Sequence, residues 1–385
     1  MAGQWAAISM LMVTQSLLVF RLTGSAAILG VLALAGAIPQ LLLFLVGGAM
    51  ADRFPKKRLL QIGQSASGVM ALAVGLTLTT GYLSAEHLGS WWVLVASAVV
   101  QGAFMAMALP ARQAIIPELL GVDRLMNALA LNNMGNNVFR LLAPAAAGLL
   151  IDSLGFAAVF YIMAGLYLLA VILTAFIPSP VKAPARHRST VTDAREGLHY
   201  IWKQNIIFLV LLFAIFYIVL FMPYQMMLPI FADSILKVGA TGLGVLQSVS
   251  GVGALTASLA LASFSSRRRG FLMLGGGMVA GLGLVTLAVS RSWYLSLAAM
   301  FIVGAGQAVH STALITTLQT LADPEYLGRV MSILMMNQGL SGLGTFFVGI
   351  LSESIGVQWA IGGFATTLVL LSLSFIVFLP RIRRL

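Results

Sequence analysis

Long apolar runs recur along the whole chain, and they restrict its fold more than any other feature. Each run has about the 20 residues that an α-helix needs to cross the hydrocarbon core of a bilayer. None alternates apolar and polar residues in the way that a membrane-spanning β-strand does. The sequence therefore predicts an all-α membrane protein with twelve transmembrane helices, at roughly 4–21, 27–51, 58–81, 91–111, 127–151, 157–178, 206–231, 241–263, 271–289, 294–318, 328–351 and 359–379.

The low charge content supports a bilayer as the solvent for most of the chain. Only 9% of the 385 residues are charged and 60% are hydrophobic, whereas about a quarter of the residues of a soluble domain are charged. The net charge of +11 comes from short basic clusters between the apolar runs, which form no continuous basic face for a nucleic acid. The sequence has no cysteine, so disulfides and thiolate metal sites are excluded.

The basic residues are divided unequally between alternate connections. Eighteen of the 22 lysines and arginines fall between helices 2 and 3, 4 and 5, 6 and 7, 8 and 9, and 10 and 11, or in the C-terminal tail. The opposite connections hold three, and the remaining one, Arg140, lies inside the fifth run. Because cytoplasmic loops carry an excess of Lys and Arg, we expect the first group of connections and the C-terminus to be cytoplasmic.

The longest connection divides the chain into two sets of six apolar runs. It begins with prolines and charges, and it contains TDAREGLHYIWKQ, which favours an amphipathic helix at the membrane interface. We therefore expect an N-terminal six-helix half over residues 1–178, a cytoplasmic linker over 179–205 and a C-terminal six-helix half over 206–385.

The two halves resemble each other in sequence. Residues 127–155 align without a gap to residues 328–356, and the alignment pairs Asn136 with Asn337 as well as two glycines and one serine. The constant offset of 201 places the fifth run over the eleventh. This pattern indicates two six-helix pseudo-repeats, which is the architecture of major-facilitator transporters, with a substrate site between the repeats near mid-membrane.

A charged loop between the second and third runs carries a direct family resemblance. The stretch GGAMADRFPKKRLL (47–60) resembles the major-facilitator signature G-x-x-x-D-R-x-G-R-K/R, with Pro55 where the family usually has glycine. The matching residues form the expected conformational switch loop: Gly48, Asp52, Arg53, Lys57 and Arg58. Topology alone explains the cations, but an acid contributes nothing to the positive-inside rule. We expect Asp52 to form contacts that differ between the inward- and outward-facing states.

Other stretches narrow the resemblance to one branch of the family. LPARQAIIPELLGVDRLMNALALNN (109–133), RLLAPAAAGLLI (140–151) and DPEYLGRVMSI (323–333) are similar to bacterial drug and siderophore exporters, a branch that includes enterobactin exporters and macrolide efflux proteins. The resemblance implies a monomeric secondary exporter in the bacterial inner (plasma) membrane, which moves bulky amphipathic molecules by alternating access and exchanges them for protons. A lysophospholipid transporter on the same fold and a transport-inactive receptor or assembly protein are the alternatives.

Polar side chains share one face of the fifth run. Their spacing of i, i+3, i+4 and i+7 places them on one side of a helix: Asn133, Asn136, Asn137 and Arg140. A charge at membrane depth usually faces a cavity or a partner, so we expect this face to line a substrate cavity, where Arg140 attracts an anionic or oxygen-rich group. Hydrogen bonds between helices, or an Arg140 side chain that reaches the interface, are the alternatives. The eleventh run repeats part of the pattern with Asn337 and Gln338.

Pro144 and Gly148 continue this run and resemble, in degenerate form, the helix 5 motif of drug antiporters. Pro144 removes a backbone hydrogen bond and can kink the helix. Gly148 permits the close approach of a neighbouring helix. Ordinary packing of small residues is the alternative interpretation.

Further candidates for the substrate cavity lie in the second half. They are Tyr217, Tyr224 and Gln225 in the seventh run and Gln307 and His310 in the tenth. Pro223 and Pro229 indicate that the seventh helix is broken. His310 can exchange a proton near neutral pH, although a lone histidine in an apolar run is more often a hydrogen-bonded packing residue. Because no carboxylate falls at mid-membrane, the sequence identifies no residue that carries a coupling proton.

Motifs of enzyme chemistry are missing from the sequence. It contains neither a G-x-x-x-x-G-K-[ST] phosphate loop nor a group of His, Asp and Glu with metal-ligand spacing. We therefore expect no enzyme activity, no bound metal and no cofactor.

Overall fold

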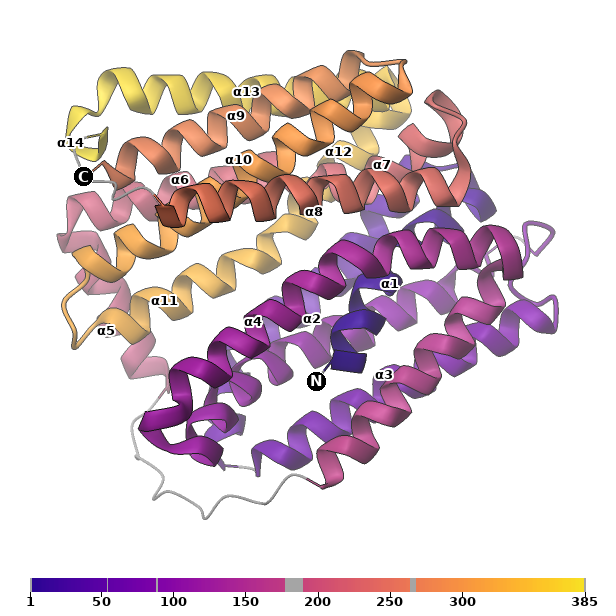
Figure 1. Cartoon of the computed structure of the whole chain (residues 1–385), viewed down its shortest axis with the longest axis horizontal. Coiled ribbons are helices and arrows are strands. Elements are labelled where there is room, and N and C mark those ends of the chain that lie inside the picture. The colour runs from indigo at the N-terminus through magenta and orange to yellow at the C-terminus, as the bar shows by residue number, and fades with distance from the viewer. Residues whose placement is uncertain (1, 54, 88, 177–189, 264–267, 384–385) are drawn as a thin grey trace. The chain divides into compact units, whose positions relative to one another are not determined.

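The computed structural model describes residues 2–53, 55–87, 89–176, 190–263 and 268–383, which form helices with no β-strand among them (Figure 1). The predicted all-α class is therefore confirmed for this part of the chain. The helices are α1 (Ala2–Thr23), α2 (Ala26–Arg53), α3 (Lys56–Thr79), α4 (Trp92–Ala175), α5 (Thr190–Lys203), α6 (Asn205–Phe221), α7 (Pro223–Ile230), the π-helix η1 (Phe231–Ile235), α8 (Gly239–Ser263), α9 (Arg269–Val289), α10 (Trp293–Leu321), α11 (Leu327–Met336), the 3₁₀-helix η2 (Asn337–Leu340), α12 (Ser341–Ile355), α13 (Val357–Phe378) and α14 (Pro380–Arg383).

Ten helical stretches of the described residues are long and apolar enough to cross a membrane. One of them, Asn137–Ala175, has 39 residues and covers two of the predicted runs. The helix Trp92–Ala108 is apolar but shorter, and it covers one more run. Within the described residues, the predicted runs therefore fall on helical backbone except at some of their ends.

The long helix α4 changes its backbone conformation at Gly155. This glycine lies between the predicted runs 127–151 and 157–178, and its φ is 83°. A positive φ is easily adopted by glycine and strained for other residues. The helical path is therefore interrupted at the point where the sequence separates two membrane-spanning segments.

The chain divides into two compact units, of which the first comprises Met1–Thr190 and Val238–Val245. Within this unit α1, α2 and α3 all pack against α4. Its interior contains fully buried side chains such as Leu17, Leu29 and Phe160.

The second unit comprises Val191–Lys237 and Leu246–Leu385. Within it α9 packs against α10 and α13, and α6 packs against α12 and α13. Phe213 on α6 and Phe231 on η1 are among its largest fully buried side chains.

Glycines allow helix backbones to touch in both units. A Cβ atom on Gly102 of α4 would collide with the carbonyl oxygen of Gly36 of α2, and one on Gly304 of α10 would collide with that of Ser250 of α8. Small residues at such crossings are typical of membrane helices, because lipid supplies no hydrophobic force that drives helices together.

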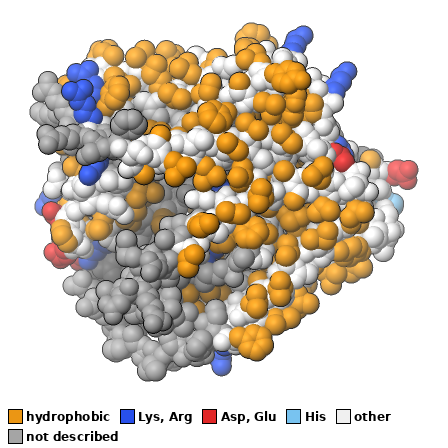
Figure 2. Space-filling model, viewed as in Figure 1, with side chains coloured by type: hydrophobic (Ala, Val, Ile, Leu, Met, Phe, Trp, Pro, Cys, Tyr) orange, Lys and Arg blue, Asp and Glu red, His pale blue; other side chains and the backbone are white. Residues whose placement is uncertain are grey.

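Apolar side chains also cover the outside of the helices. Phe176, Tyr294 and Phe378 each expose more than three quarters of their surface. Figure 2 shows hydrophobic side chains across the described face, with a few lysines and arginines near its margins. Exposed apolar area on this scale is unfavourable in water and suits a hydrocarbon environment.

Candidate functional site

The densest group of predicted site residues lies in the second unit, where α6 contacts α10. The ring of Tyr217 on α6 stacks on the imidazole of His310 on α10, with 3.6 Å between ring centroids and 21° between ring planes. Both side chains are buried, with 3% and 1% of their surface exposed. The fold thus brings together two candidates that are 93 positions apart in the sequence.

Each of these two side chains keeps one polar atom unpaired. Nδ1 of His310 lies 2.9 Å from the carbonyl oxygen of Met273 on α9, so Nδ1 carries the proton and donates it. Nε2 is then an acceptor, and neither it nor the Tyr217 hydroxyl has a hydrogen-bond partner among the described residues. A buried polar atom left unpaired costs about 1–3 kcal/mol. Such atoms indicate a place for a ligand, an ion or a water molecule.

Aromatic rings extend this stack along α6. The ring centroid of Phe213 lies 5.7 Å from that of His310, and the centroid of Phe221 lies 4.8 Å from that of Tyr217. Tyr224 follows, with its centroid 5.1 Å from that of Phe221. We refer to Phe213, Tyr217, Phe221, Tyr224 and His310 as the aromatic cluster.

A helix break separates the two tyrosines of the cluster. The helix α6 ends at Phe221, and Pro223 opens α7 at the first helical position, where a missing backbone N–H leaves no hydrogen bond unmade. After Pro229 the chain continues as the π-helix η1, a conformation that is rare and often found at functional sites. The broken helix that the two prolines indicate is therefore present.

The remaining candidates of the second unit differ in burial. Asn337 is 2% exposed in η2, which packs against α6, and its Nδ2 has no partner among the described residues. The adjacent Gln338 is exposed, while Gln225 and Gln307 are half-buried. Asn337 is therefore, like members of the aromatic cluster, a buried group with unused hydrogen-bonding capacity among the described residues.

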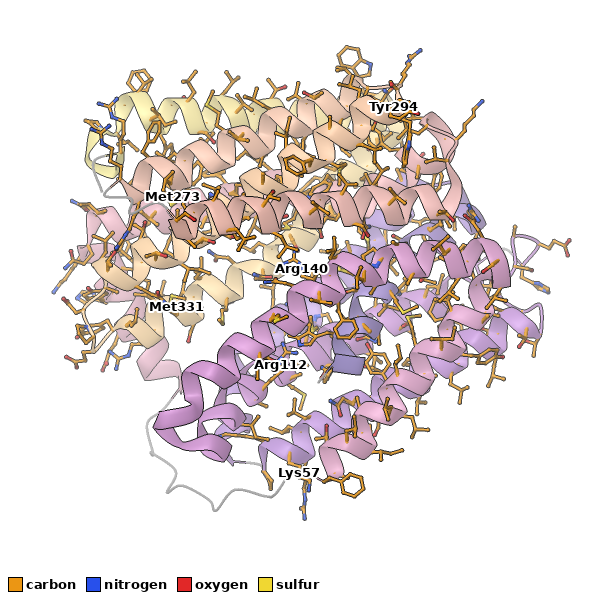
Figure 3. The ribbon with its side chains drawn as sticks, viewed as in Figure 1. Lys57, Arg112, Arg140, Met273, Tyr294 and Met331 are labelled. Carbon is orange, nitrogen blue, oxygen red and sulfur yellow. The ribbon has the colours of Figure 1, made fainter. Side chains whose placement is uncertain are left out.

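The polar face of the first unit is described only in part. Asn137 and Arg140 are exposed on α4, and Arg140 is labelled in Figure 3. The side chains of Asn133 and Asn136 lie outside the described ones. The assignment of this face to a substrate cavity stays a prediction.

The predicted switch loop joins α2 and α3. Of its predicted residues, Gly48, Asp52 and Arg53 have side chains that lie outside the described ones. Lys57 donates a hydrogen bond of 2.6 Å from Nζ to the carbonyl oxygen of Ala175, at the end of α4, where free carbonyl groups attract cations. Arg58 is exposed. The switching role of Asp52 stays a prediction.

Pro144 and Gly148 lie where α4 packs against the first residues of α8, within the first unit. A Cβ atom on Gly148 would collide with the carbonyl oxygen of Ala240, and one on Gly244 would collide with that of Pro144. The backbones are therefore in direct contact along this stretch. A part in transport for these two residues stays a prediction.

Asp152 fixes the start of α8 in the same region. Its carboxylate accepts hydrogen bonds from the backbone amide of Thr241 at 2.8 Å and from the Thr241 hydroxyl at 2.6 Å. A carboxylate is favourable at a helix N-terminus because the first amides lack intrahelical partners. The sequence shows Asp152 only as an acid near a helix end.

The first unit also contains buried polar residues that the sequence analysis missed. Nε2 of Gln64 on α3 donates to Oε1 of Gln4 on α1 at 3.0 Å, and the Thr174 hydroxyl on α4 donates to Oε1 of Gln64 at 3.2 Å. We call these three residues the glutamine chain. A second, looser chain consists of Ser67, Gln101 and Tyr167. The available signal was a single glutamine within an apolar run, because a polar side chain there needs a partner.

Arg112 is a further residue whose position the sequence did not reveal. It contributes to the count of cytoplasmic charges, yet only 5% of its surface is exposed. Its guanidinium carbon lies 3.9 Å from the ring centroid of Trp5 on α1, and Figure 3 shows Arg112 on α4 beside the start of α1.

The amphipathic helix expected in the linker is present as α5 and packs against the start of α11. Glu196 forms an ion pair of 2.8 Å with Arg329. Tyr200 stacks on Tyr326 with 4.3 Å between centroids, and its hydroxyl accepts a hydrogen bond of 3.0 Å from the Asp323 amide. Burial raises the pKa of the Tyr200 phenol, and the carboxylate of Asp323 adds to the increase.

Apolar helices of membrane-spanning length define a helical membrane protein. The chain superimposes on the crystal structure of the D323A mutant of the nucleoside transporter NupG with a TM-score of 0.77 and 15% identity, covering 98% of this chain and 97% of that one. The sequence model of the Major Facilitator Superfamily matches residues 2–344. The chain therefore belongs to the Major Facilitator Superfamily, and it is a transporter rather than an enzyme.

One of two curated relatives is a transporter by name, and the other is a multidrug efflux pump by name. The chain is 24% identical over 371 residues to the Staphyloferrin A transporter of Staphylococcus aureus, covering 91% of this chain and 88% of the relative. It is 26% identical over 381 residues to the multidrug efflux pump Tap of Mycolicibacterium fortuitum, covering 96% and 91%. These similarities agree with the branch that the sequence motifs resemble. They imply small-molecule substrates and a multi-pass position in a membrane.

Proposed function

We propose that the chain is a secondary active exporter, which moves bulky amphipathic small molecules such as a siderophore or a drug out of the cytoplasm. In this proposal the twelve helices form two six-helix repeats that expose a central site alternately to each side of the membrane. The exporter works as a monomer in the bacterial inner membrane, with the basic connections in the cytoplasm, and exchanges its substrate for protons. The names of the two relatives support the substrate class.

The observation that carries this proposal is the free polar edge of the aromatic cluster. The rings offer stacking surface to an apolar or aromatic part of a ligand, and such contacts contribute about 0.5–1.5 kcal/mol each. The unpaired Tyr217 hydroxyl and His310 Nε2 offer hydrogen bonds to its polar part. A site that combines apolar walls with a few polar groups is typical of small-molecule recognition.

In this proposal the other predicted residues have separate roles. We assign substrate contacts in the N-terminal half to the face of α4 that carries Arg140, and conformational switching to Asp52. Pro144 and Gly148 lie at the close backbone contact between α4 and α8. We assign to them the role of keeping these two helices in contact during transport. The proton-carrying residue is left unassigned in this proposal.

Transport into everted membrane vesicles tests the proposed function. Vesicles that contain the chain are given an imposed pH gradient and an enterobactin-type siderophore, a macrolide or a lysolipid. We expect gradient-dependent uptake of the siderophore or the macrolide, which stops when a protonophore collapses the gradient. The Tyr217→Phe variant is expected to lose most of this uptake, and the Arg291→Gln variant, altered at an exposed arginine, is expected to keep it.

Two outcomes would contradict the proposal. Uptake of the lysolipid alone would favour a lipid transporter on the same fold. No gradient-dependent movement of any of the three compounds, with the protein present in the vesicles at normal amount, would remove the support for an exporter.

A further inference from the structure

Arg112 is a buried cation with no ion-pair partner among the described residues. Its guanidinium group is 5% exposed, and the described residues give it neither an ion pair nor a hydrogen-bond partner. Arg112 lies four residues beyond the apolar helix Trp92–Ala108, and burial lowers its pKa to about 10. It is therefore still protonated at neutral pH. A buried charge normally persists only with a partner of opposite sign, because removing it from water is costly.

The stack on Trp5 leaves the hydrogen-bonding edge of the guanidinium group unused. The guanidinium carbon lies over the Trp5 ring, 3.9 Å from its centroid, and this cation–π contact supplies no oxygen acceptor. The N–H bonds of arginine lie in that plane, where two of them form a fork that matches the two oxygens of a carboxylate. The geometry therefore orients the group without satisfying it.

Two donors at the start of α1 also lack a hydrogen-bond partner among the described residues. Nε1 of Trp5 and Nε2 of Gln4 are buried, and neither has a hydrogen-bond partner among the described residues. The amide of Gln4 is held in place because its Oε1 accepts from Gln64 at 3.0 Å. The unpaired groups at the start of α1 and on Arg112 are all donors, so they favour an acceptor with negative charge.

We propose that Arg112, together with Gln4 and Trp5, binds a carboxylate group of the transported molecule. This inference rests on the proposed function and specifies the substrate further: an exported molecule that carries at least one carboxylate. The competing interpretation is a purely structural joint, in which Arg112 and Trp5 only hold α1 against α4. The two differ in whether a carboxylate ligand depends on Arg112.

Direct binding to the purified full-length chain separates these interpretations. Calorimetry is carried out with citrate, a simple tricarboxylate, and with its neutral trimethyl ester, in detergent without a pH gradient. We expect citrate to bind and the ester not to bind. The Arg112→Gln variant should bind citrate about tenfold more weakly or worse, since it loses a bidentate charged contact. Arg112→Lys keeps the charge but loses the fork and should be intermediate. Arg291→Gln, at an exposed arginine, should bind as the unaltered chain does.

A second variant keeps the test informative if Arg112→Gln does not fold. Trp5→Phe retains an aromatic face for the guanidinium group and removes the Nε1–H donor together with part of the ring system. We expect its melting temperature to stay close to that of the unaltered chain while citrate binding weakens several-fold. Equal binding of citrate and its ester, or unchanged citrate affinity in both Arg112→Gln and Trp5→Phe, would overturn the proposal.

A lipid control identifies the source of the anionic group. If phosphatidylglycerol in a nanodisc displaces citrate and phosphatidylcholine does not, the group held by Arg112 is a lipid headgroup, and the assignment to a substrate is wrong. Because the assay measures binding alone, Arg112-dependent binding without vesicle transport would count against the proposed export and leave this site standing. Vesicle export without citrate binding would support the proposed export and count against the Arg112 site.

Discussion

The glutamine chain of the first unit and the aromatic cluster of the second are both buried polar groups in apolar surroundings, but they use their polar atoms differently. In the glutamine chain the hydrogen bonds run from Thr174 to Gln64 and from Gln64 to Gln4, so three helices are joined by side chains. In the aromatic cluster His310 is bonded on one nitrogen only, and the Tyr217 hydroxyl is free.

This difference separates a structural group from a binding group. Removing Gln64 leaves the two groups that it bonds, on Gln4 and Thr174, unpaired, which lowers the free energy of unfolding. Removing a polar atom that had no partner relieves a cost already present in the folded state. The same chemical change, a polar atom replaced by an apolar one, should therefore have opposite effects on stability in the two places.

The largest effect on stability is expected for Gln64→Leu. This substitution breaks both hydrogen bonds of the glutamine chain and leaves Oε1 of Gln4 unpaired between α1 and α3. We expect the free energy of unfolding to fall by about 2 kcal/mol, given about 1 kcal/mol for each buried bond and a further cost for the unpaired atom. The midpoint of unfolding in increasing dodecyl sulfate measures the loss.

Gln338→Leu is the matched control, since Gln338 is exposed. It should leave the unfolding midpoint unchanged. If Gln64→Leu and Gln338→Leu give the same midpoint, the glutamine chain contributes nothing to stability. It is then not a structural group, and the contrast with the aromatic cluster is wrong.

The next largest effect is a tenfold change in transport without a loss of stability, expected for Tyr217→Phe. The substitution deletes only the free hydroxyl and retains the stack on His310. We expect the free energy of unfolding to stay the same or rise by up to about 1 kcal/mol, while export falls about tenfold because one substrate hydrogen bond is lost. The unfolding midpoint and vesicle uptake are measured on the same preparation.

Tyr294→Phe controls for the chemistry of this change, because Tyr294 is 80% exposed and is labelled in Figure 3. Neither stability nor export should change in it. If Tyr217→Phe is destabilised as much as Gln64→Leu, the hydroxyl is already satisfied, for example by bound water, and it is not free for a substrate.

The helices themselves were predictable because each apolar run must satisfy its own backbone hydrogen bonds in a bilayer. The break after Phe221 was also predictable, since Pro223 cannot continue the ladder of backbone hydrogen bonds. The partners of buried side chains were not. Gln4 and Gln64 are 60 positions apart, and nothing in a periodic pattern specifies which helix faces which.

Adjacent residues show the same limit on a smaller scale. Asn337 and Gln338 are both amides in the eleventh run, yet the first is buried and the second exposed, because the 3₁₀ turn η2 presents them to different sides. Arg112 was counted as a loop charge because a charge count indicates the side of the membrane and not the depth of a side chain. Its stack on Trp5 joins residues 107 positions apart.

Substitutions of His310 by two different amides separate its two nitrogens. The side-chain nitrogen of Asn occupies roughly the position of Nδ1 and can donate there, whereas the amide oxygen of Gln can occupy roughly the position of Nε2 and accept there. Both variants lose the stack on Tyr217. His310→Asn should retain the bond to Met273 and be more stable than His310→Gln by up to about 1 kcal/mol, whereas His310→Gln should retain more export.

The unfolding midpoints and the vesicle uptake of these two variants are compared directly. The reverse order in stability would mean that the Met273 bond is not the structural one. Equal export in both would remove Nε2 from the substrate site and leave the Tyr217 hydroxyl as its only tested contact.

The smallest effect is expected at α5, where a polar contact is satisfied but exposed. The Tyr200 hydroxyl accepts from the Asp323 amide at 3.0 Å, and water can replace it in Tyr200→Phe, so the loss should be below about 0.5 kcal/mol. The stack on Tyr326 remains and keeps α5 in place. Hydrogen exchange of the α5 amides measures the change.

The pH dependence of α5 gives the same variant a second readout. Burial raises the pKa of Tyr200 above its unfolded value of about 10, so the folded state holds the phenolic proton more tightly. The resulting stabilisation is present below the unfolded pKa and is lost as the pH rises through the folded one. Exchange of the α5 amides should therefore accelerate above about pH 10 in the unaltered chain and less so in Tyr200→Phe. If Tyr200→Phe instead costs as much as Gln64→Leu, the number of hydrogen bonds would set the cost rather than their burial. The contrast between the glutamine chain and the aromatic cluster would then need another physical basis.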